Sequence, residues 1–172
     1  MTREQHPAQW LLVATKPRQE KRAAEHLANQ SFEVFCPFVM VETIARGKKS
    51  VKSEALFPGY LFIHWPQEQS TASVRSTRGV RDIVRFNGEP ARVADAIIET
   101  IKNRVTELSE RPLSSEQLPK PGERVTVIEG PFAGFEAIFE TFNGMERAII
   151  LLELLGQTQR LTISLRQVTT NR

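Results

Sequence analysis

The segment 124–172 carries two apolar patterns that no single secondary structure satisfies. With a helical period, apolar side chains recur at steps of three and four on both sides of Asn143-Gly144. These side chains are Val125, Ile128, Phe132, Phe135, Phe139 and Phe142 before the dipeptide, and Met145, Ile149, Leu152 and Leu155 after it. This spacing predicts two helices joined by a turn.

The same segment also alternates with a period of two, which is typical of strands. The alternating residues are Val125 and Val127, then Phe135, Ala137 and Phe139, then Leu161, Ile163 and Leu165. An Asn-Gly dipeptide between apolar runs is also a strong signal for a β-hairpin. Gly130, Pro131 and Gly134 disfavour the first helix, which would need support from a partner surface. The segment therefore predicts either a helical hairpin or an antiparallel barrel of about five strands.

The rest of the chain predicts a larger domain at 1–110 and a linker at 111–123. Short apolar runs predict strands at 10–15, 32–45 with a break at Pro37, 56–65 and 80–86. Amphipathic or capped stretches predict helices at 16–30, 68–78 and 94–109. Strands interleaved with helices predict an α+β sandwich, and the prolines and serines of 111–123 predict a flexible connection. The segment 124–172 is too small for a large core of its own.

Composition restricts the class of protein. With 40% hydrophobic and 25% charged residues the chain is globular, and its apolar run 148–155 is too short to span a bilayer. The first residues lack a signal-peptide core, so we expect a soluble, cytoplasmic protein. Cys36 is the only cysteine, which excludes an internal disulfide and a cysteine-built zinc site and predicts a small buried hydrophobe. His6, His26 and His64 accompany no nucleophile motif or phosphate loop, so we expect no enzyme, no cofactor and no metal.

The net charge of +3 is unevenly distributed. Residues 1–110 hold 16 Lys and Arg against 13 Asp and Glu, while residues 111–172 hold 7 of each. The basic residues form three clusters: Lys16, Arg18, Lys21 and Arg22; Arg46, Lys48, Lys49 and Lys52; and Arg75, Arg78, Arg81 and Arg85. Such clusters indicate either a surface that faces a polyanion or an ordinary solvated face.

Two motif groups resemble a known family. ERVTVIEGPFAGFEAIF at 123–139 resembles a KOW motif, and LFPGYLF at 56–62 followed by TRGVRDIVRF at 77–86 resembles an NGN domain. Their order and separation resemble the NusG family of transcription elongation factors over residues 10–168. KPRQEKRAAEHL and ARGKKSVKSEALFPGYLF most resemble the operon-specific branch of that family, in which the KOW segment is a helical hairpin when docked and a β-barrel when released. Sequences compatible with two packings are rare but physically admissible.

The resemblance implies that the first domain binds the clamp helices of bacterial RNA polymerase and suppresses pausing and termination. The matching apolar patch consists of Phe57, Pro58, Tyr60, Phe62 and Phe86, which as individual residues could equally be core. A second contact, to the polymerase gate loop, would involve Thr71, the one residue of the family's His-Thr-Thr run kept in Ser70-Thr71-Ala72.

The resemblance also implies recognition of a DNA element called ops on the non-template strand of a paused polymerase. The matching residues are Lys16, Gln19, Arg22, His26 and Arg78. Lysine and arginine can neutralise phosphates or read base edges, and a histidine can stack on an extruded base.

In this branch the docked hairpin covers the polymerase-binding patch. Candidates for the covering side are Phe135, Ile138, Phe139, Ile149, Leu152 and Leu155, and Glu54 with Arg147 matches the ion pair that holds the domains together. The released barrel would bind a small-subunit ribosomal protein and couple transcription to translation. The protein is expected to be a monomer.

Two other functions are also compatible with the sequence. A general factor of the same family would never have its polymerase-binding patch covered, and its binding would not depend on the DNA sequence. A ribosome-associated RNA-binding protein could also carry a KOW barrel, although the NGN-like segment argues against it.

Overall fold

The computed structural model describes residues 9–66, 70–110, 113, 135–141 and 143–169, with side chains as far as Gln157. In chain order the elements are β1 (Gln9–Thr15), α1 (Glu20–Asn29), β2 (Val34–Phe35), β3 (Phe38–Ala45), β4 (Lys48–Ala55), β5 (Tyr60–Trp65), α2 (Ala72–Arg75), β6 (Val80–Ile83), β7 (Arg85–Phe86), β8 (Glu89–Pro90), β9 (Arg92–Val93), α3 (Asp95–Leu108), α4 (Phe135–Glu140) and α5 (Gly144–Thr169).

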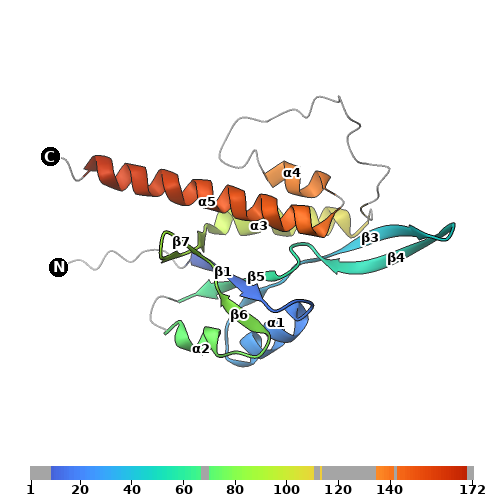
Figure 1. The fold of residues 1–172 in the computed structure, drawn as a ribbon, viewed down its shortest axis with the longest axis horizontal. Helices are drawn as coiled ribbons and strands as arrows, with labels where there is room; N and C mark the ends of the chain where they lie inside the picture. The colour runs from blue at the N-terminus through green and yellow to red at the C-terminus, as the bar shows by residue number, and fades with distance from the viewer. Residues whose placement is uncertain (1–8, 67–69, 111–112, 114–134, 142, 170–172) are drawn as a thin grey trace.

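An antiparallel sheet in the order β2-β5-β1-β6, with β9 also paired to β1, forms the middle layer. Because successive side chains of a strand point to opposite faces, the sheet separates two apolar cores. Leu11 and Ile63 join α1 and α2 in one core, while Leu12 and Phe62 join α3, α4 and α5 in the other. Figure 1 shows these helices on opposite sides of the sheet. The prediction of an α+β sandwich is confirmed for this part of the chain.

The helix α3 forms as its apolar pattern predicts. Ile97, Ile98 and Ile101 are buried on one side of it. Asp95 lies in its first turn, where a carboxylate interacts favourably with the helix dipole, and accepts a hydrogen bond of 2.9 Å from the Trp10 indole nitrogen. This bond ties the start of α3 to β1.

Strands β3 and β4 form an arm that extends away from the sandwich (Figure 1). The two strands form a hairpin with a two-residue turn at Arg46 and Gly47. Both turn residues have positive φ, 52° and 76°, as the tightest hairpin turns require.

Two strand predictions were too long. The expected strand 56–65 begins only at Tyr60, because Gly59 has a φ of 85° and donates its N–H to Glu20 Oε1 at 2.8 Å. The expected strand 80–86 is divided into β6 and β7, with Val84 between them donating its N–H to Leu12 O.

The linker prediction needs one correction. Leu113 lies within the expected linker 111–123 but is buried and forms a parallel bridge with Val41 of β3. Its N–H donates to Met40 O at 2.9 Å. The chain is therefore attached to the arm just after α3. The rest of 111–123 and the residues 124–134 lie outside the described part.

The described residues of the C-terminal segment are helical. The helices α4 and α5 lie on either side of Asn143, as the helical period predicts. The described residues do not include the first half of that pattern, Val125 to Phe132, or Phe142. The barrel remains a prediction. No described helix combines the length and apolarity needed to cross a membrane.

Candidate functional site

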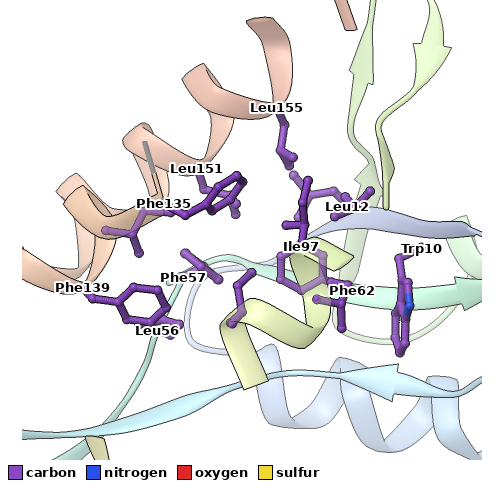
Figure 2. Packing of buried hydrophobic residues seen from close by; sticks show 14 of the residues in the cluster. Trp10, Leu12, Leu56, Phe57, Phe62, Ile97, Phe135, Phe139, Leu151 and Leu155 are labelled. Carbon is purple, nitrogen blue, oxygen red and sulfur yellow. The ribbon is translucent and has the colours of Figure 1, made fainter. Parts of the chain in front are cut away.

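The hairpin of α4 and α5 packs on an apolar face of the first segment. We call this the covered face and define it by Leu12, Leu56, Phe57 and Ile97. All four are buried, and Figure 2 shows hairpin side chains directed toward them. A face of this kind would be unfavourable if exposed on a monomer. The hairpin therefore keeps it from water.

The hairpin contributes six buried apolar side chains. They are Phe135, Ile138 and Phe139 from α4, and Ala148, Leu151 and Leu155 from α5. Their spacing of three and four residues places each set on one side of its helix.

The expected apolar stripe of α5 was wrong in part. Ile149 is 53% exposed and Met145 is 72% exposed, while Leu152 is half-buried and only Leu155 is buried as expected. Leu151, which the stripe omitted, is fully buried. The reason is that α5 carries apolar residues on all sides, so spacing alone cannot identify its buried side.

Arg147 fixes which side of α5 faces inward. Its side chain is 0% exposed, and its guanidinium donates to the Leu56 carbonyl at 2.8 Å, the Ala55 carbonyl at 3.3 Å and the Thr141 carbonyl at 3.1 Å. It also donates to Glu54 Oε1 at 3.4 Å. Burial lowers the pKa of Arg147, and the charge and hydrogen bond of Glu54 oppose that shift. The contacts join α5 to the end of β4.

Two glycines of α5 allow close approach to the first segment. A Cβ at Gly144 would collide with Glu54 Oε1 and lie 2.7 Å from Pro58 Cγ. A Cβ at Gly156 would lie 3.4 Å from a ring carbon of Phe86, which is ordinary contact. The first glycine is therefore required for docking, and the second is not.

The five residues expected to bind the polymerase clamp lie on or beside the covered face. Phe57 and Phe62 are fully buried, and their rings meet edge to face with centroids 5.8 Å apart. Pro58, Tyr60 and Phe86 are half-buried. Phe62 stacks on Phe35 and belongs to the core, whereas Phe57 lies against the hairpin (Figure 2). Thr71 lies apart from this group, immediately before α2.

The residues expected to bind DNA gather around α1. Gly79 brings them together, because its φ of 86° and its closeness to Ala23 let the loop before β6 pack on α1. Lys16 donates its N–H to Gly79 O at 2.8 Å, which places Arg78 next to the start of α1. Of the five, Lys16, Arg22 and Arg78 are exposed, while Gln19 and His26 are half-buried.

The remaining basic residues separate in space. Arg46, Lys48, Lys49 and Lys52 lie exposed toward the end of the β3–β4 arm. Arg75 pairs with Asp82 at 3.1 Å, so it is less available to an anion.

Cys36 is half-buried beside α1 instead of fully buried. Burial, with a smaller contribution from Glu20, raises the pKa of its thiol to about 12, although Lys21 opposes the shift. A thiol of that pKa is unreactive near neutral pH. Within the described residues no cluster of His, Cys, Asp and Glu could hold a metal ion.

Sequence reasoning missed Arg104 and Glu136, which join α3 to α4. Arg104 Nη2 donates to Glu136 Oε2 at 3.2 Å. A residue pair so far apart in the chain leaves no signal in a single sequence.

The first segment is thus a mixed α/β sandwich whose apolar face is covered by the C-terminal helices, and basic residues lie around α1 on the opposite side of the sheet. Comparison with known proteins identifies its family. The profile of the family described as "Transcription termination factor nusG" matches residues 8–102, more than half of the chain. The chain belongs to the NusG family, whose members are transcription factors and not enzymes.

Several curated relatives share this family. The NusG termination/antitermination protein of Escherichia coli K12 is 27% identical over 92% of this chain and 94% of its own length. The NusG protein of Buchnera aphidicola is 28% identical over 81% of this chain and 78% of its own. A solved structure of Thermotoga maritima NusG has 25% identity and a TM-score of 0.40, covering 72% of this chain and 74% of its own.

Proposed function

We propose that the chain is an operon-specific elongation and antitermination factor of the RfaH type. Residues 1–110 would bind RNA polymerase and DNA, residues 111–123 would connect the two domains, and residues 124–172 would block polymerase until a DNA signal releases them. The block is steric, because the covered face cannot meet polymerase and the hairpin at the same time.

The contact of Arg147 with Glu54 carries this proposal. A fully buried arginine is expensive unless its charge and its hydrogen bonds are satisfied. Arg147 meets this need only when α5 lies on the end of β4, where Glu54 and two carbonyls accept its hydrogen bonds. This is what a specific docked state requires, since apolar packing alone would allow α5 to rotate.

The composition of α5 supports a second, released structure. Ile149 and Met145 are exposed in the hairpin. Exposed apolar side chains are unfavourable, and a helix whose only role was to dock here would not need them. In a strand, the side chains of 149–155 would alternate between two faces. A barrel of about five strands could therefore bury residues that the helix exposes. The stretch would then offer a surface to a ribosomal small-subunit protein.

The group around α1 would read an ops-like element on the non-template strand of a paused polymerase. Lys16, Arg22 and Arg78 are exposed and can reach phosphates or base edges, and His26 lies beside them. The gate-loop contact would depend on Thr71. The factor would act as a monomer in the cytoplasm.

Cleavage of the linker tests the proposal. Cleavage at a protease site placed within 114–120 of the full chain would separate the hairpin from the first domain and leave the amino-acid sequence of each domain unchanged. We expect the far-UV CD spectrum to lose helix and gain strand after cleavage, and we expect RNA polymerase to co-purify with the first domain only then. A helical spectrum that survives cleavage and separation of the fragments, together with unchanged polymerase binding, would contradict it.

A general NusG-like factor is the second candidate. It is favoured by similarity to Escherichia coli NusG along nearly the whole chain, at 27% identity over 92% of it. Such a factor would bind polymerase before any cleavage and without a DNA signal. A ribosome-associated KOW protein would instead co-purify with ribosomes from the start.

A further inference from the structure

Arg104 joins α3 to the hairpin at a place separate from Arg147. Its Nη2 donates to Glu136 Oε2 of α4 at 3.2 Å, and its Nη1 donates to Glu107 Oε2 of α3 at 2.9 Å. The same guanidinium lies over the ring of Phe139, 5.4 Å from the centroid. One side chain therefore meets a carboxylate and an aromatic ring that both belong to α4.

The Arg104 side chain is partly exposed, but one of its nitrogen atoms is removed from water. The Nε atom of Arg104 is buried and has no hydrogen-bond partner among the described residues. A buried donor without a partner is unfavourable, so other contacts must compensate for it. Stacking on Phe139 and the bonds to two carboxylates are the interactions that do so.

The helix α4 needs such an anchor. It has six residues, Phe135–Glu140, and isolated helices of that length are not stable in water. Its buried residues depend on the first segment for their cover. To fix the orientation of α4, a directional contact is needed as well. The planar guanidinium of Arg104 provides one, because it both stacks on a ring and donates hydrogen bonds.

We propose that Arg104 is a second interdomain anchor, which holds α4 through Glu136 and Phe139 while Arg147 holds α5. The proposal rests on the proposed function, because it describes how the hairpin is held and released. The hydrogen-bond partners described above for Arg104 and Arg147 are different residues. Apart from the bond of Arg147 to the Thr141 carbonyl after α4, the described contacts of the two arginines hold different helices, so α4 can detach before α5.

Exposure distinguishes the two anchors. The Arg104 and Glu136 side chains are 37% and 45% exposed, whereas Arg147 is 0% exposed and its partner Glu54 is 40% exposed. Salt screens exposed pairs and leaves buried ones largely unaffected. The α4 anchor should therefore weaken with ionic strength more than the α5 anchor, because Arg147 also donates buried hydrogen bonds to the Leu56 and Ala55 carbonyls.

The substitution Glu136→Gln tests this in the full-length chain, because it removes the charge and keeps the shape of the side chain. The readout is amide hydrogen exchange measured by NMR, with α4 and α5 followed separately. For a partly exposed ion pair we expect α4 exchange about threefold faster at low salt, with a difference that shrinks as salt is added. Exchange at Leu151 and Leu155 of α5 should stay unchanged.

Two controls separate the anchor from simpler effects. Glu140→Gln removes another carboxylate of α4, an exposed one, and should leave exchange unchanged. Glu136 also lies in the first turn of α4, where any carboxylate favours the helix. We therefore repeat Glu136→Gln in an Arg104→Met background, where the anchor predicts no further effect.

Three results would overturn the proposal: the same acceleration in the Arg104→Met background, the same acceleration with Glu140→Gln, or equal acceleration in α4 and α5. The first two indicate a local property of α4, and the third indicates that the hairpin leaves as one unit. None of these readouts depends on formation of a barrel. A permanently helical tail would therefore refute the fold switch without affecting this test.

Discussion

Removing either partner of the pair between Glu54 and Arg147 should release the hairpin, but by different amounts. Glu54→Gln keeps an oxygen that can accept the hydrogen bond and removes only the charge. Arg147→Ala removes at least the four hydrogen bonds described above, three of which go to backbone carbonyls that would be left without this donor. The arginine substitution should therefore be the more severe.

The structure sets the magnitudes. Removing one partner of a buried ion pair costs about 3–5 kcal/mol, and exposed pairs contribute about 0–1 kcal/mol. The Glu54 side chain is 40% exposed and its contact is long, at 3.4 Å, so we expect about 1 kcal/mol for Glu54→Gln, near the exposed limit. For Arg147→Ala, which acts at a fully buried position, we expect about 3 kcal/mol. These values correspond to increases of about fivefold and about a hundredfold in the ratio of open to closed protein.

NMR spectra of the free full-length protein provide the assay, since signals of the closed and open states can be integrated separately. Glu153→Gln is the matched control, because that carboxylate is exposed on α5 and lies outside its first turn. Equal populations in Glu153→Gln, Glu54→Gln and Arg147→Ala would refute the reasoning. So would a larger effect of Glu54→Gln than of Arg147→Ala.

Three further predictions concern single positions. Gly144→Ala should destabilise the docked state through the collision described above. Gly156→Ala should stabilise it by up to about 1 kcal/mol, because alanine has the higher helix propensity. Both effects are measured from the population of the open state. Leu151→Ala should destabilise the docked hairpin by about 2–5 kcal/mol, whereas Ile149→Ala, at an exposed position, should change α5 amide exchange little. If Ile149→Ala had the larger effect, the apolar stripe expected from the sequence would be correct after all. Cys36, with a thiol pKa raised from 9.0 to about 12, should react with a disulfide reagent at pH 8 far more slowly in the native protein than in urea, and equal rates would contradict its burial.

Much of the sandwich follows from local sequence. The helix α3 repeats isoleucines at helical spacing, and the turn of the arm carries Gly47 where a positive φ is needed. Such signals act over a few residues, so one sequence suffices to read them. The strand limits failed at Gly59, whose positive φ and bond to Glu20 precede β5, and at Val84, which lies between β6 and β7.

The site was harder to predict because its determinants are distant in the chain. Glu54 and Arg147 were paired only through resemblance to a family, since 93 positions separate them. Arg104 and Glu136 had no such guide and were missed. The expected covering residue Ile149 was wrong because a helix that is apolar on all sides has no face that spacing can identify.

That ambiguity of α5 and the burial of Arg147 are connected. A helix with one apolar side is oriented by the hydrophobic effect alone, but non-directional burial cannot orient a helix whose sides are all apolar. A guanidinium that finds Glu54 and the Ala55 and Leu56 carbonyls at the end of β4 supplies the missing direction, because another rotation of α5 would take it away from these acceptors. The same all-round apolar character that makes this contact necessary is also compatible with the strand-based arrangement that we propose for the released segment. In a chain that had to form only the hairpin, we would expect polar residues at Met145 and Ile149 and no need for a buried charge.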